Sequence, residues 1–167
     1  LMISATFTGM IISSFESALA SSVVLTAFIP MLMDTGGNTG SQSSVTIIRA
    51  LSLNEIQFKD ILKVIWKEIR VACLCGVALS AVAFLKIMLV DRLLLGNVAV
   101  TVPVAIIVCL TLAITVVVAK IIGCCLPMFA NKLGFDPAVM ASPFITTIVD
   151  AVSLAVYFMI ATNILGL

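Results

Sequence analysis

Two aspartates stand alone in long apolar stretches of this chain. Asp34 lies in a segment of glycines and oxygen-bearing side chains, residues 30–44, and Asp150 lies in the last apolar stretch, residues 138–166. A charge at the centre of a membrane helix costs at least about 2.5–3.5 kcal/mol, so an acid kept there marks an ion or proton pathway. No lysine or arginine within residues 138–166 can pair with Asp150. Its charge must therefore be removed by a proton, surrounded by water or neutralised by a cation.

The polar groups near the two acids offer oxygen ligands. They belong to Asn38, Thr39, Ser41, Gln42, Ser43, Ser142 and Thr146. Oxygen ligands suit hard cations such as Mg2+ and Ca2+, and Mg2+ binds through one or two carboxylates while it retains several waters. A divalent cation also relieves the repulsion between neighbouring carboxylates. We therefore predict a site for hydrated Mg2+ formed by Asp150, Asn38, Asp34, Ser142 and Thr146.

The acid in the last stretch belongs to a polar stripe on an otherwise apolar helix. Polar residues recur there at three- and four-residue offsets, which places them on one helical face: Thr146, Thr147, Asp150, Ser153 and Tyr157. With a rise of about 1.5 Å per residue, Asp150 lies roughly 10–18 Å and Asp34 roughly 6 Å from the cytoplasmic face. The depths overlap once helix tilt is allowed for, so both acids can face one cavity. The structural alternative is a protonated Asp150 that is hydrogen-bonded across helices.

The composition is that of an integral membrane protein. Hydrophobic residues make up 62% of the 167 residues and charged residues 10%, against about 45–50% and about 25% in soluble domains. The mean hydropathy is +1.31. A net charge of +1 provides no basic surface for nucleic acid. Histidine is missing, the five cysteines lie in apolar stretches and no nucleophile–base pair is visible, so we expect neither an imidazole metal site nor an enzyme.

Five apolar stretches read as membrane spans, since a bilayer core takes about 20 apolar residues per helix. They are residues 1–14, 18–50, 68–90, 98–126 and 138–166. We treat residues 1–167 as one transmembrane domain and expect its first span to be incomplete at the start. Residues 51–67 carry apolar residues at three- and four-residue spacing and a tryptophan, which predicts an amphipathic helix in the membrane interface.

The segment from residue 30 to residue 44 predicts an interruption of the second span. Gly36, Gly37 and Gly40 stand there among hydroxyl and amide side chains. A backbone inside hydrocarbon leaves the helix only where it is buried in protein or lines a water-filled cavity. We therefore expect a broken second helix beside the ion path. The alternative is that the glycines only let helices approach closely, as small residues do in membranes.

Basic residues set the expected orientation. Two connections, between the second and third and between the fourth and fifth spans, hold seven of them with their helix ends: Arg49, Lys59, Lys63, Lys67, Arg70, Lys120 and Lys132. The other two connections hold Lys86 and Arg92. The positive-inside rule places the richer side in the cytoplasm, so the amino terminus is cytoplasmic and the carboxyl terminus outside. An odd number of spans can still enclose a pore by pairing with a second copy across a two-fold axis.

Several motifs together resemble the MgtE magnesium channels and their eukaryotic solute-carrier relatives. The most specific is the Gly-Gly-Asn-x-Gly-x-Gln core of residues 36–42. The others are residues 9–16, residues 47–51, Asp136-Pro137-Ala138, and Asp150 followed by Tyr157-Phe158. The motifs follow the family's order, and the similarity covers essentially the whole chain.

The resemblance implies an all-α homodimeric channel domain with five transmembrane helices per subunit and a pore at the two-fold axis, lined by the second and fifth helices. It gives Asp150 the role of main pore acid binding hydrated Mg2+, and Asn38 that of the pore-facing asparagine. Two positions depart from the family pattern, since Ser142 replaces an asparagine and Asp34 stands where a glycine can occur. The family's cytoplasmic regulatory region matches no part of these residues.

The sequence thus predicts a homodimeric pathway through the plasma membrane for Mg2+, directed inward by the membrane potential. The choice among Mg2+, Mn2+, Co2+ and Ca2+ stays open, because all of them accept carboxylates. One functional alternative is an exchanger coupled to protons or Na+ carried by Asp34 or Asp150. The other is a module that assembles in the membrane without transporting anything.

Overall fold

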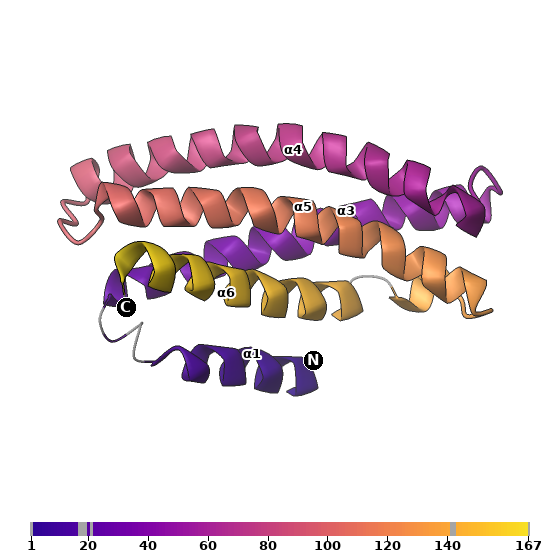
Figure 1. Cartoon of the computed structure of the whole chain (residues 1–167), viewed down its shortest axis with the longest axis horizontal. Coiled ribbons are helices and arrows are strands. Elements are labelled where there is room, and N and C mark those ends of the chain that lie inside the picture. Colours follow the sequence, from indigo (N-terminus) through magenta and orange to yellow (C-terminus); the bar gives the residue numbers. More distant parts are fainter. Residues whose placement is uncertain (1, 17–19, 21, 141–142, 167) are drawn as a thin grey trace.

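The computed structural model is all α-helical and describes residues 2–16, 20, 22–140 and 143–166 (Figure 1). The elements in these ranges are α1 (Met2–Ser14), the 3-10 helix η1 (Val23–Phe28), α3 (Ile29–Ser52), the 3-10 turn η2 (Phe58–Asp60), α4 (Ile61–Lys86), the π-helical η3 (Ile87–Leu94), α5 (Val102–Lys132), the 3-10 turn η4 (Pro137–Met140) and α6 (Pro143–Leu165). The five α-helices of the described residues confirm the all-α prediction and follow the five predicted spans in order.

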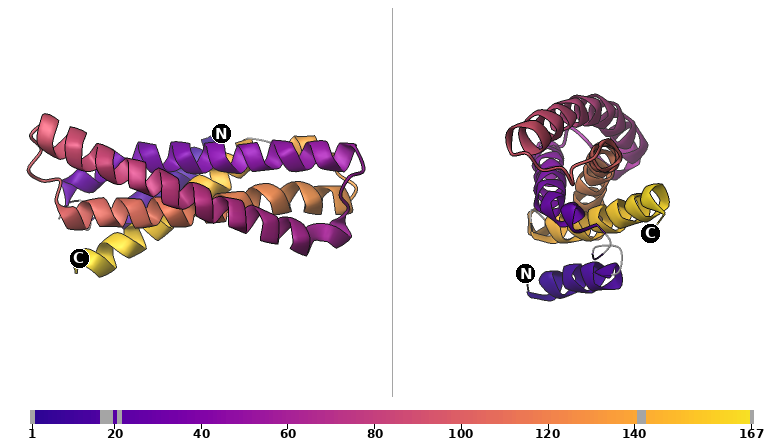
Figure 2. Two further views of the ribbon diagram at one scale, coloured as in Figure 1. Left: turned by 90° about the horizontal axis from the view of Figure 1, so that it is seen from above. Right: turned by 90° about the vertical axis from the view of Figure 1, so that its left-hand side faces the viewer.

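The four long helices form one antiparallel bundle (Figure 1). α3 and α5 run in one direction, and α4 and α6 run in the other. α5 packs against α3, α4 and α6. α1 lies to one side of the bundle, against α6, as the end-on view shows (Figure 2). α3 and α6 also pack against each other, which brings together the two segments that carry the candidate acids.

Separate apolar cores occupy the two ends of the bundle. One joins η1, α5 and α6 around the fully buried Leu25, Tyr157 and Phe158. The Tyr157 hydroxyl donates a hydrogen bond of 2.9 Å to the carbonyl of Leu25, 132 residues earlier in the chain. The other core joins α3, α4 and α5 around Ile47 and Met128. Because a buried tyrosine hydroxyl needs a partner, the Tyr157 bond fixes η1 against α6.

Glycines mark the places where α3 crosses α5 and α6. A Cβ on Gly36 would lie 2.8 Å from Thr115 on α5 and equally close to Val149 on α6. Gly123 on α5 lies so near the Gly40 carbonyl that a side chain at residue 123 would collide with it. Small residues let membrane helices pack backbone to backbone. The glycines therefore permit close packing, as the alternative reading of this segment proposed.

α3 runs without interruption through residues 30–44, so the prediction of a broken second helix is wrong for this segment. Glycine lowers the stability of an isolated helix by about 0.8–1.0 kcal/mol per residue, but packing on α5 and α6 offsets that loss here. The Asn38 amide also donates a 3.0 Å hydrogen bond to Asp34, one turn earlier. The irregular backbone lies before the segment, in η1, and Pro30 occupies the first turn of α3, where a missing N–H is tolerated.

Residues 51–67 do not form the single amphipathic helix that was predicted. α3 ends at Ser52, and Asn54 adopts a left-handed backbone with a φ of 56°. Asp60 then accepts a 3.2 Å hydrogen bond from the Gln57 N–H just before α4 begins. Asparagine tolerates the left-handed conformation better than most residues, so a turn divides a stretch whose apolar spacing looked continuous. Trp66 lies on α4 and is 61% exposed.

Three stretches of the described residues are long and apolar enough to cross a membrane: Phe58–Leu94, Val102–Lys132 and Pro143–Leu165. They agree with the third, fourth and fifth predicted spans. The first of them exposes a series of large apolar side chains, including Leu62, Leu74, Val77, Val82 and Leu85. Exposed apolar side chains along a membrane-length helix suit contact with lipid.

Candidate functional site

A cavity of about 220 Å³ lies where α3 and α6 pack together. Its lining residues are Met33, Asp34, Gly37 and Asn38 of α3 and Thr146 and Asp150 of α6. Each set recurs at three- or four-residue spacing, so each occupies one face of its helix. The cavity therefore combines two carboxylates, one amide and one hydroxyl, drawn from segments more than a hundred residues apart.

Asp150 is the polar residue in this cavity with an unmet hydrogen-bonding requirement. Its Oδ1 is buried and accepts no hydrogen bond from any described residue. Gly37 faces it across the helix interface, since a Cβ there would lie 3.8 Å from Asp150 Oδ1 and 3.1 Å from Thr146 Cγ2. Burying a carboxylate oxygen without a donor is costly. The oxygen is therefore available to a cation or to water.

Asp34 and Asn38 form the α3 side of the cavity. The Asn38 Nδ2 donates a hydrogen bond of 3.0 Å to Asp34 Oδ1. Both side chains are exposed. Because the amide nitrogen makes this bond, the amide oxygen of Asn38 keeps its capacity to accept from a hydrated ion.

The structure brings together four of the five predicted ligands: Asp34, Asn38, Thr146 and Asp150. The fifth, Ser142, lies outside the described residues. Whether these residues bind a metal stays a prediction. Gly37 is not among the predicted ligands, although the glycine segment was expected beside the ion path. Gly36 packs against α5 and α6. Gly37 has no side chain and so leaves room for Thr146 and Asp150 of α6 to lie against α3.

The predicted polar stripe of α6 divides into two parts. Thr146 and Asp150 line the cavity, whereas Ser153 and Tyr157 are buried within the bundle. Ser153 donates a 2.6 Å hydrogen bond to the Val149 carbonyl one turn earlier, and Tyr157 donates to the Leu25 carbonyl. Each of the two inner hydroxyls thus has a backbone acceptor and takes no part in the cavity.

The balance of charge distinguishes this cavity from a larger one between α3 and α4. The larger cavity, of about 540 Å³, is lined by three acids and three bases: Arg49, Glu55, Asp60, Lys63, Lys67 and Glu68. The smaller one is lined by two acids, and none of the described residues that line it is basic. The ion pairs among the described residues, Lys63–Asp60, Lys86–Asp91 and Lys120–Glu68, include neither Asp34 nor Asp150. Uncompensated negative charge makes the smaller cavity the better candidate for a cation.

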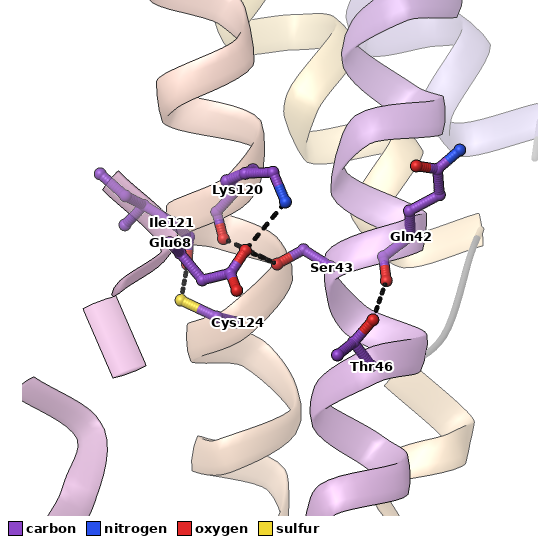
Figure 3. Close-up of polar contacts among 7 residues, drawn as sticks. All are labelled: Gln42, Ser43, Thr46, Glu68, Lys120, Ile121 and Cys124. Atoms are coloured by element: carbon purple, nitrogen blue, oxygen red, sulfur yellow. Dashed lines mark hydrogen bonds and ion pairs between the residues drawn. The ribbon is translucent and has the colours of Figure 1, made fainter. Parts of the chain in front are cut away.

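A pair of opposite charges contacts another part of α3 (Figure 3). Glu68 on α4 and Lys120 on α5 form an ion pair of 2.9 Å, with side chains that are 8% and 15% exposed. Ser43 on α3 donates a hydrogen bond of 2.8 Å to the same carboxylate oxygen. Lys120, assigned above to the connection between the fourth and fifth spans, lies well within α5. It therefore contributes an internal contact and not a cytoplasmic surface charge.

Known proteins similar to this chain point to one family. A family profile described as MgtE, divalent cation transporter, matches residues 29–160, a range that contains α3, α4, α5 and the whole cavity. The chain is 37% identical over 155 residues to the magnesium transporter MgtE of Bacillus subtilis, which covers 92% of this chain and 32% of that protein.

Two further magnesium transporters named MgtE show similar agreement. That of Thermus thermophilus is 35% identical over 162 residues, with coverage of 95% of this chain and 34% of the relative. That of Enterococcus faecalis is 34% identical over 155 residues, with coverage of 93% and 32%. The chain spans about a third of the length of these curated relatives. The match over most of its length shows that the chain belongs to the MgtE family of divalent cation transporters.

Proposed function

We propose that this chain is the membrane domain of a magnesium transporter and that Mg2+ passes along the α3–α6 face. The observation that carries the proposal is the cavity in which Asp34 and Asp150 lie together with Asn38 and Thr146, and to which no described residue contributes a basic side chain. Three relatives that align over more than nine-tenths of the chain are named magnesium transporters. Family membership and the chemistry of the cavity therefore support the same cargo.

The cavity suits an ion that keeps most of its water. Mg2+ gives up its waters reluctantly and is held by one or two carboxylates together with retained water. In the proposed mechanism Asp150 balances the charge of the ion through its buried Oδ1, which accepts no hydrogen bond from any described residue. Asn38 and Thr146 accept hydrogen bonds from the ion's water shell, and Asp34 adds negative charge beside them.

A second copy of the chain completes the pore in this proposal. α3 exposes a polar row along one face, formed by Asp34, Asn38, Gln42, Thr46 and Arg49. Lipid tails cannot hydrogen-bond such a face, so these residues border water or protein. Two-fold pairing places two copies of Asp150 around one axis, with the ion between them. With the amino terminus in the cytoplasm, the Arg49 end of α3 faces the cytoplasm and a negative membrane potential draws the cation inward.

Cation flux through reconstituted protein tests the proposal. Wild type and Asp150→Ala are placed in liposomes that contain a Mg2+-sensitive dye, and influx is measured with an inside-negative potential in the presence of Mn2+, Co2+ or Ca2+ as competitors. We expect influx in wild type and a loss of about a hundredfold in the variant, because an ion without its countercharge meets a barrier of roughly 2.5–3.5 kcal/mol. Chemical cross-linking should show the same dimer for both proteins.

Two outcomes would contradict the proposal. Undiminished, ion-selective flux through Asp150→Ala would remove Asp150 from the path. Wild-type liposomes that pass no cation would favour the non-transporting assembly module instead.

A coupled exchanger is the second candidate, because the buried Asp150 oxygen without a described donor can accept a proton as well as face a cation. A proton gradient imposed without a membrane potential should then drive Mg2+ uptake. A channel would respond only to the electrochemical gradient of Mg2+ itself. The same liposomes, equilibrated at equal and unequal pH, separate the two mechanisms.

A further inference from the structure

The buried charge pair, Glu68 and Lys120, contacts α3 from the side opposite the cavity. Ser43, which donates to Glu68, follows Asp34 by nine residues, or about two and a half turns at 3.6 residues per turn. The Gln42 side chain, which belongs to the polar row of α3, points away from the charge pair (Figure 3). The pair therefore holds α3 from behind its ion-facing row.

Stabilisation of the fold does not explain a buried ion pair in this position. Two charges withdrawn from water rarely stabilise a fold more than an apolar pair of the same volume would. The best-attested benefit of buried polar groups is that they select one register among several that apolar packing would accept. Here the element whose register is at stake is α3, because Glu68 Oε2 accepts hydrogen bonds from both Lys120 and Ser43.

The neighbouring crossing of α3 and α5 is formed mainly by backbone and small side chains. Gly40 on α3 and Gly123 on α5 meet backbone to backbone, and a glycine presents no side chain that would resist sliding or rotation. Lys120 precedes Gly123 by about one turn, and its carbonyl lies 3.4 Å from Ser43 Oγ as a second, weaker acceptor for the one hydroxyl proton that Glu68 accepts at 2.8 Å. Hydrogen bonds are directional. The hydrogen bond of Ser43 therefore adds a directional contact to a crossing that van der Waals packing otherwise holds.

A small displacement of α3 would change the candidate ion site. Asp34, Gly37 and Asn38 move with α3, whereas Thr146 and Asp150 belong to α6. A shift by one residue is about 1.5 Å, which is enough to make or break a hydrogen bond. We propose that Glu68, Lys120 and Ser43 are positioning residues that hold the polar row of α3 opposite Asp150. This inference rests on the proposed function, but one of its two readouts does not depend on transport.

The test compares variants of the full chain in lipid nanodiscs and liposomes. Ser43→Ala removes the contact between α3 and the charge pair, and Glu68→Gln removes the charge itself. A double variant exchanges the charges, with Glu68→Lys and Lys120→Glu. The matched control is Ser80→Ala, since Ser80 donates a 2.8 Å hydrogen bond from α4 to the Cys109 carbonyl on α5 and leaves α3 untouched.

The structural readout is a distance between spin labels, and the functional readout is the Mg2+ concentration that half-saturates uptake. The labels sit on cysteines introduced at Leu53, just after α3, and at Phe144 on α6, both of them exposed, in a background without the native cysteines. Ser43→Ala and Glu68→Gln should shift or broaden the distance by at least about 1.5 Å, one residue's rise. They should raise the half-saturating concentration about threefold or more, as loss of a hydrogen bond to a charged group would.

The control and the charge exchange decide the result. Ser80→Ala should change neither the label distance nor the half-saturating concentration. The charge exchange should bring both closer to the wild-type values than Glu68→Gln does, because residues 68 and 120 again carry opposite charges. Unchanged label distances in Ser43→Ala and Glu68→Gln overturn the proposal, as do equal effects of Ser43→Ala and Ser80→Ala or shifted distances with unchanged half-saturation. If Glu68→Gln fails to fold, Ser43→Ala and the exchange still decide. If wild type carries no Mg2+, the proposed function fails, while the label distances continue to test the positioning of α3.

Discussion

Acidic side chains meet two different environments on opposite faces of α3. On one face, Glu68 is buried and accepts hydrogen bonds from Lys120 and Ser43. On the other face, Asp150 has a buried oxygen without a described donor and shares its cavity with Asp34. An acid whose charge is met within the chain holds helices together. An acid whose charge is unmet is available to a mobile cation, and neutralising the two kinds should therefore have opposite consequences.

The largest expected effect is on transport by Asp150→Asn. The variant keeps the size of the side chain and removes its charge, so Mg2+ uptake should fall about a hundredfold. Its stability without Mg2+ should be unchanged or higher, because a buried oxygen with an unmet charge is costly. Uptake into liposomes and thermal unfolding in Mg2+-free detergent measure the two effects. Normal uptake together with lower stability would show that Asp150, like Glu68, holds helices together and does not bind the ion.

Glu68→Gln should show the reverse profile, with stability as the main loss. Lys120 would be left buried without a counter-ion, which costs about 3–5 kcal/mol. Replacing both partners by methionine should recover most of that loss, because an apolar pair avoids the cost of desolvation. Reversible unfolding in mixed detergent micelles provides the measurement. If the Glu68→Gln protein were as stable as wild type, the acid on this face of α3 would not hold the helices together, and the contrast with Asp150 would be wrong.

Gly37→Ala tests how closely the two faces of the cavity must approach. The added Cβ would lie 3.1 Å from Thr146 Cγ2, so α3 and α6 must separate or repack at a cost of about 1–3 kcal/mol. We expect reduced Mg2+ uptake and a lower melting temperature. Gly9→Ala is the matched control, since a Cβ at residue 9 meets nothing within 4 Å. Equal behaviour of the two variants would mean that the contact of Gly37 with α6 has no importance.

The smallest effect is expected for Asp34→Asn. Asp34 is exposed, so water and salt screen its charge, and such charges contribute about 0.2–1 kcal/mol. The half-saturating Mg2+ concentration should rise about two- to fivefold at low ionic strength and less at high salt. Glu55→Gln, an acid of the other cavity, should leave uptake unchanged. A loss as large as that of Asp150→Asn would make Asp34 an equal partner in binding the ion.

Hydropathy predicted the third, fourth and fifth spans, and two isolated acids in apolar sequence predicted the shared cavity. The predicted span 98–126 corresponds to α5, and the span 138–166 to α6. Asp34 and Asp150 could be expected at one cavity because a carboxylate in apolar sequence has few explanations, and the helical rise set their depths. These inferences use only local composition and spacing.

The features that were missed depend on contacts between distant segments. The glycines of α3 favour a break by their own propensity, and the packing that keeps the helix intact comes from Thr115 and Val149, which lie far along the chain. From the sequence, Lys120 is predicted to be a charge near the end of a membrane span. Its pairing with Glu68 spans 52 residues and cannot be inferred from the spacing of either residue.

The hydrogen bond from Tyr157 to Leu25 constrains the order in which the helices can fold during synthesis. Its donor is made 132 residues after its acceptor, and at about 5–20 residues per second the ribosome takes on the order of 10 s to reach it. During that interval the aromatic side chains of α6 that bury η1 are also missing. η1, which precedes α3, can therefore reach its final conformation only after α6 has been synthesised and inserted. Folding at the amino-terminal end of α3 thus depends on completion of the carboxyl-terminal helix.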